Sequence, residues 1–117
     1  MEYLLLIYHN EADANARSDA DKREIFQEFM AFRQDIKSRG KHKAGGPLEP
    51  TTAGATVRVR DGKTMVTDGP FAETKEQLGG YYLVEAKDLD EAISMAARIP
   101  SSKYGSTEVR AIRKLDM

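Results

Sequence analysis

Apolar and polar residues alternate along the chain in blocks whose lengths separate strands from helices. The first block, Tyr3–Tyr8, is a continuous apolar run without Gly or Pro, which is typical of a strand in the middle of a sheet. The polar stretch that follows it, His9–Arg17, is expected to form a loop. Beyond this loop the apolar positions recur at intervals of three and four residues, which predicts an amphipathic helix.

This helix is expected to begin at Ser18, with Asp19 or Asp21 completing the N-terminal cap, and to end at Gly40. Its apolar face consists of Ile25, Phe29, Phe32 and Ile36, widened by Phe26 and Met30. Arg33 interrupts this face. Its guanidinium either reaches the rim of the core while its stem stays buried, or points at an anionic ligand between helix and sheet.

The second half of the chain predicts more strands than helices. Thr56–Arg60 and Lys63–Thr67 flank Asp61 and Gly62, a pair that favours a tight turn, so these segments predict a β-hairpin. The other expected elements are a weak strand over 41–48, a strand over 81–86, a helix that starts with a capping box at Asp88–Glu91 and stops at Pro100, and a last strand over 107–114.

The resulting order, β-α-β-(hairpin)-β-α-β, predicts an α+β fold of the ferredoxin-like type, with an antiparallel sheet and both helices on one face. We expect one domain over residues 1–117. The opposite sheet face would carry Leu4 and Leu6, or else Leu5 and Ile7, and either pair argues against contact with water. A homodimer formed through the sheet faces is therefore expected.

Composition narrows the classes of function that the chain can have. Eighteen Lys and Arg against nineteen Asp and Glu leave a net charge of −1, so the chain has no basic excess for binding nucleic acid. It has no cysteine, which excludes thiolate chemistry and disulfides. The first apolar run lacks the features of a signal peptide, and no apolar segment is long enough to span a membrane. A cytoplasmic location without membrane contact is the expectation.

The segment Asp68–Gly80, DGPFAETKEQLGG, concentrates turn-forming and charged residues between two strands. The favoured interpretation is structural: Asp68 and Gly69 turn the chain, a short helical turn carries 73–77, and Gly79 and Gly80 lead into the next strand. The alternative is a binding segment at the mouth of a pocket. In that case Phe71 forms an apolar wall, and Asp68, Glu73 and Lys75 orient a ligand.

Histidines and tyrosines supply the remaining candidates. His9 follows the first strand directly, where an imidazole could act as a general base near neutral pH. His42 stands between two lysines and reads as part of a solvated edge. Two distant histidines do not favour a metal site, and no cofactor is expected. Tyr81, at the start of a strand, is a candidate to line a ligand pocket.

Three segments together resemble a known family: Thr67–Tyr82 with its DGPFAETKE string, the opening Met1–Tyr8, and Asp88–Ala92. They are similar to the DGPF-type branch of the YCII-related family, over nearly the whole chain. The resemblance implies a ferredoxin-like subunit that pairs into a dimeric α/β barrel, as in muconolactone isomerase and the antibiotic-biosynthesis monooxygenase-like proteins. Members of this branch are mostly uncharacterised, and some occur beside or fused to sigma-factor-like proteins.

The chain departs from the family pattern at one position. Better-described members are credited with a His–Asp pair whose histidine lies on the first helix. Here that helix contains no histidine, and Glu28 or a neighbour aligns with the position. The chemistry of that pair cannot be transferred to this chain.

Three functions remain open at this point. The first is a barrel that binds a small polar metabolite, with cofactor-free acid–base chemistry by His9, Asp68 or Glu73 and with Phe71, Lys75, Arg33 and Tyr81 contacting the ligand. The second is a non-enzymatic regulatory module that acts with a transcription partner such as a sigma factor. The third is a homodimer in which the DGPF segment has only a structural role.

Overall fold

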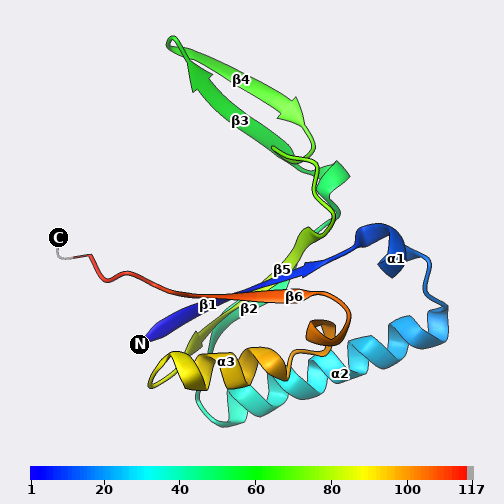
Figure 1. The fold of residues 1–117 in the computed structure, drawn as a ribbon, viewed down its shortest axis with the longest axis vertical. Helices are drawn as coiled ribbons and strands as arrows, with labels where there is room; N and C mark the ends of the chain where they lie inside the picture. The colour runs from blue at the N-terminus through cyan, green and yellow to red at the C-terminus, as the bar shows by residue number, and fades with distance from the viewer. Residues whose placement is uncertain (116–117) are drawn as a thin grey trace.

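The computed structural model describes residues 1–115 and contains a four-stranded antiparallel sheet with helices on one face (Figure 1). The sheet has the order β2-β5-β1-β6, and β3 and β4 form a separate hairpin. The strands are β1 (Glu2–His9), β2 (His42–Pro47), β3 (Ala55–Arg60), β4 (Lys63–Asp68), β5 (Gln77–Glu85) and β6 (Ser106–Ala111). The helices are α1 (Glu11–Asn15), α2 (Asp19–Ser38) and α3 (Leu89–Ala97), with short 3-10 helices η1 (Thr51–Ala53) and η2 (Pro100–Lys103).

This arrangement confirms the predicted ferredoxin-like α+β fold. Each of the strand pairs β1 with β5, β1 with β6 and β2 with β5 is antiparallel. The strand predicted to be central, β1, lies between β5 and β6. This position explains its apolar run, because the residues of one face are buried and those of the other face are half-buried.

The two faces of β1 carry different residues. Tyr3, Leu5 and Ile7 are buried against the helices, whereas the alternate residues Leu4 and Leu6 are half-buried on the open face. The buried side chains that complete the core are Phe32, Ile36, Tyr82, Val84, Ala86, Ala92, Met95, Ala96 and Ile99. Of the two apolar pairs considered for the open face, the structure therefore places Leu4 and Leu6 there.

The helices begin and end close to the residues that their sequences indicated. The Ser18 hydroxyl caps α2 by accepting a hydrogen bond from the Asp21 backbone N–H at 3.1 Å, and Gly40 follows the helix with a left-handed φ of 71°. In α3 the Asp88 carboxylate caps the first turn. Leu89 and Ile93 of this helix are about half exposed, whereas Ala92, Met95 and Ala96 are buried.

The hairpin β3–β4 projects away from the rest of the molecule (Figure 1). Asp61 and Gly62 both have positive φ, 52° and 74°, as the predicted tight turn requires. Val57 and Val66 are more than 60% exposed, so the arm contributes little to the core. The Cα radius of gyration, 16.3 Å, exceeds the value of about 13 Å expected for a compact chain of this length.

Two local predictions were wrong. The stretch 9–17 was expected to be a loop but contains the short helix α1, which is too short to show a periodic pattern of apolar residues. The Asn10 side chain caps this helix by accepting a hydrogen bond from the Asp13 backbone N–H. Residues 73–76 form no helical turn, because β5 already begins at Gln77 and takes Gly79 and Gly80 into the strand. Within residues 1–115, no helix is both long and apolar enough to cross a membrane.

Candidate functional site

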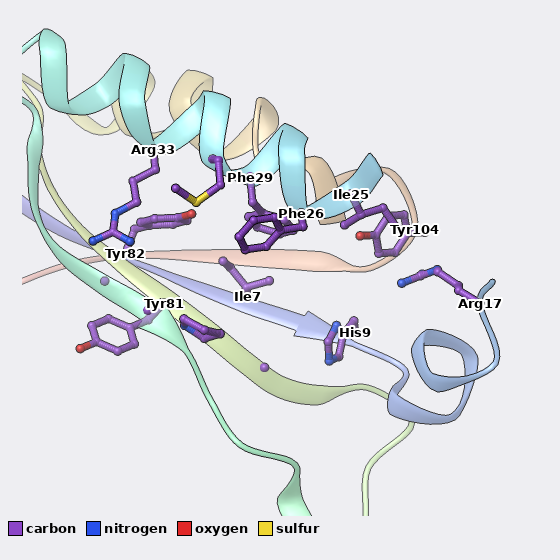
Figure 2. Close-up of a pocket in the computed structure, with 16 residues that line it drawn as sticks. Ile7, His9, Arg17, Ile25, Phe26, Phe29, Arg33, Tyr81, Tyr82 and Tyr104 are labelled. Carbon is purple, nitrogen blue, oxygen red and sulfur yellow. The ribbon is translucent and has the colours of Figure 1, made fainter. Parts of the chain in front are cut away.

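A cavity of about 500 Å³ lies between α2 and the sheet (Figure 2). Its α2 wall is apolar and consists of Ile25, Phe26, Phe29 and Met30. Phe26 and Met30 are 63% and 46% exposed. They extend the apolar face of α2 beyond the core and line the cavity. A concave, mostly apolar space of this size is the usual form of a small-molecule site.

Glycines form the sheet side of the cavity. Gly45 and Gly46 of β2 pair with Tyr82 and Tyr81 of β5, and Gly80 of β5 pairs with Pro47. A Cβ on Gly79 would lie 2.7 Å from His9 Nε2, and a Cβ on Gly45 would lie 2.7 Å from Tyr82 Cδ1. These two glycines therefore allow ring side chains to approach the strands closely.

Polar side chains gather at the two ends of the cavity (Figure 2). At one end lie His9 and Arg17, and the Arg17 guanidinium carbon is 4.1 Å from the centroid of the Tyr104 ring. At the other end Arg33 reaches from α2 toward Tyr82. The His9 Cα lies four residues along β1 from Leu5, the partner of Tyr82, which corresponds to a separation of about 13 Å.

The Arg33 end is positively charged and partly buried. Arg33 Nε is buried and has no hydrogen-bond partner within residues 1–115. Burial, with the charges of Lys37 and Arg33, lowers the pKa of His42, which stacks edge-on to Tyr82 at a ring distance of 6.2 Å. Burial also raises the pKa of the Tyr82 phenol. Tyr82 therefore stays protonated at neutral pH and can donate a hydrogen bond.

Three of the predicted site residues lie at this cavity: His9, Arg33 and Tyr81. His9 is on the same sheet face as Ile7 and lies against Gly79. Tyr81 pairs with Leu6, and its ring lies on the side of the sheet opposite α2 (Figure 2).

The other predicted residues, Asp68, Phe71, Glu73 and Lys75, are exposed and do not line the cavity. Phe71 is 79% exposed. Gly69 turns the chain after β4 with a φ of 88°, and its N–H donates to the Gly54 carbonyl at 2.8 Å. The roles expected for these four side chains stay predictions.

The end of the DGPF segment is bound to the rest of the fold by hydrogen bonds. The Asn10 side chain donates to the Lys75 carbonyl at 3.0 Å, and the Glu11 N–H donates to Gln77 Oε1 at 2.9 Å. The Ser106 hydroxyl donates to the Glu76 carboxylate at 2.8 Å. These contacts hold the start of β5 against α1 and β6, and so help to position His9.

Sequence reasoning missed two contributors, Arg17 and Tyr104. Arg17 precedes the α2 cap and Tyr104 follows η2, so they come together only through the tertiary fold. Phe26 and Met30 had been assigned to the helix face without a distinct role. Within residues 1–115 no group of three His, Asp or Glu side chains is arranged to hold a metal ion.

Comparison with known proteins identifies the family of this chain. The model of the YCII-related domain matches residues 1–116. The chain belongs to the YCII-related family. A relative, an uncharacterised protein of Rhizobium meliloti, is 40% identical over 114 residues, which cover 96% of this chain and 92% of the relative.

One solved structure similar to this YCII-related chain is the 5-chloro-2-hydroxyhydroquinone dehydrochlorinase TftG of Burkholderia phenoliruptrix, in complex with 2,5-dihydroxybenzoquinone. The match has a TM-score of 0.53 and 19% sequence identity, and it covers 97% of this chain and 94% of that protein. At this identity the likeness shows a shared fold.

Proposed function

We propose that this YCII-related protein binds a small metabolite in the cavity between α2 and the sheet. The observation that carries the proposal is the combination of an apolar wall, from Phe26 to Met30, with polar groups at both ends of one cavity. Such a site holds an apolar body by burial and orients it through a few polar contacts. The similar fold of TftG, which is a small-molecule enzyme, supports a ligand of this size.

His9 is the proposed acid–base group for cofactor-free chemistry. It lies at the end of β1, where its imidazole lies close to Gly79 of β5 and lines the cavity. An imidazole can accept or donate a proton near neutral pH. Binding without turnover would instead favour the alternative of a regulatory module with a transcription partner.

We further propose that the protein is a homodimer in which the open sheet faces meet. The half-buried residues of this face are Leu4, Leu6 and Tyr8 of β1 with Leu78, Tyr81 and Leu83 of β5. No helix of the described chain covers them (Figure 1). Contiguous apolar side chains on one sheet face favour contact with another protein surface.

The experiment that tests ligand binding compares two Met→Trp variants. Met30 lines the cavity and Met65 lies on the hairpin arm, and both are about half exposed. A panel of small ring acids, phenols and lactones is screened by thermal shift, because a ligand that binds only the folded state raises the melting temperature. We expect Met30→Trp to weaken binding of any hit at least tenfold, whereas Met65→Trp binds it normally.

Equal affinity in both variants would contradict the assignment of binding to this cavity. If no member of the panel binds wild type, the proposed function itself fails. Unchanged circular dichroism of Met30→Trp serves as the folding control.

A further inference from the structure

Arg33 is a charged side chain without an acceptor in the described part of the chain. Its Nε is buried and unpaired, and residues 1–115 contain no ion pair to it. A guanidinium stays protonated at all physiological pH values. Because a buried donor without an acceptor is costly, this position is suited to a ligand that supplies one.

Two carboxylates of α2, Asp35 and Glu28, form ion pairs with residues other than Arg33. Asp35 forms ion pairs with Arg98 and Arg39, and Glu28 contacts Lys103 at 3.6 Å. No Asp or Glu of the described chain lines the cavity. Arg33 therefore has no internal counter-ion within reach, and the neighbouring Lys37 adds to the positive field that also acts on His42.

The surroundings of Arg33 suit an oxygen anion attached to an apolar body. The Tyr82 ring lies beside the guanidinium and its hydroxyl is at the far end of the ring (Figure 2), so the protonated phenol offers a further donor along the cavity wall. Phe29 and Met30, one turn or less before Arg33 on α2, provide apolar contact next to it. A charge-assisted hydrogen bond is stronger where apolar walls exclude water.

We infer that the cavity selects small aromatic carboxylates, with the carboxylate bound by Arg33 at the end remote from His9. This inference rests on the proposed function and specifies its ligand. The planar fork of a guanidinium matches the two oxygens of a carboxylate. Because the His9 Cα lies about 13 Å along β1 from the Cα of Leu5, the partner of Tyr82, the group that reacts with His9 lies at the end of the ligand opposite its carboxylate.

The test compares cinnamate with cinnamamide, its neutral isostere, by calorimetric titration at constant salt. The proteins are wild type, Arg33→Met, Arg33→Lys and the control Arg60→Met on the exposed hairpin arm. We expect wild type and Arg60→Met to prefer cinnamate at least tenfold. Arg33→Met should bind both probes with the affinity that wild type has for cinnamamide, and Arg33→Lys should keep part of the preference.

Retained binding of cinnamamide shows that Arg33→Met is folded, and its melting temperature should equal or exceed that of wild type, because a buried N–H donor without an acceptor is removed. Equal affinity of wild type for both probes would overturn the inference, as would an undiminished preference in Arg33→Met. If wild type binds neither probe but binds other compounds in a Met30-dependent manner, the carboxylate inference fails while the proposed function stands.

Discussion

At the scale of single residues, the position of His9 depends on a glycine. Gly79 is an unpaired bulge residue of β5, and a Cβ there would approach the His9 ring to 2.7 Å. The imidazole is a side chain that can rotate, so the clash is relieved by moving the ring. The same sheet region contains Gly46, where a Cβ would meet nothing within 4 Å.

We therefore expect Gly79→Ala to displace His9 at a cost of about 0.5–1.5 kcal/mol, the cost of an off-rotamer side chain, and to reduce any turnover more than ligand binding. Gly46→Ala, where the added Cβ would meet nothing within 4 Å, is the matched control and should leave the position of the His9 ring unchanged. The chain has two histidines, so NMR resolves their ring signals separately. A His9 signal that is unchanged in Gly79→Ala would show that this glycine does not position the ring.

At the scale of elements, α2 is joined to the segment after α3 through Asp35. Arg98 donates to Asp35 Oδ2, and Arg39 donates to Oδ1 at 3.2 Å. The hydrogen bond from Arg98 is the main cause that lowers the pKa of Asp35 below its ordinary value of 3.8. A carboxyl whose pKa is lowered by folding stabilises the fold above its unfolded pKa, and this stabilisation is lost as pH falls through the folded pKa.

Asp35→Asn should consequently lower the melting temperature at pH 7 by at most a few degrees, because exposed ion pairs contribute little. The difference from wild type should shrink as the pH is lowered below 3.8. Thermal melts between pH 7 and pH 3 measure this, with Asp13→Asn on α1 as a control that removes an exposed carboxylate. A difference that stays constant across this range would refute the role of the Asp35 charge.

At the scale of the whole molecule, the open sheet face determines how chains assemble. Leu6 lies near its centre, between Tyr81 of β5 and Glu108 of β6. A charge buried there in a dimer would lack a partner and would be strongly unfavourable. Leu89, which is 49% exposed on α3, lies on the opposite side of the sheet.

The proposed homodimer therefore predicts a twofold mass in analytical ultracentrifugation for wild type and for Leu89→Glu. Leu6→Glu should sediment as a monomer with an intact circular dichroism spectrum. A wild-type monomer at micromolar concentration would contradict the homodimer. Dissociation by Leu89→Glu but not by Leu6→Glu would place the interface on the helical side instead.

Local sequence signals predicted most elements because their causes are local. The Ser18 cap, the Asp61 and Gly62 turn and the apolar period of α2 each depend on residues within one or two turns of one another. Strand β5 was predicted to start four residues too late, since its glycines resemble a turn in the sequence. The role of Gly79, which leaves room for the His9 ring of β1, depends on strand pairing.

The candidate site divides in the same way. The sequence by itself determined the ferredoxin-like fold, the central position of β1 and the presence of His9 and Arg33 as candidate groups, because period, capping and turn chemistry act over short distances. Only the tertiary structure decided that these two residues share one cavity with Arg17 and Tyr104 while Phe71 does not line it. Which side chains meet depends on how α2 packs over the strands, and that contact joins residues far apart in the chain.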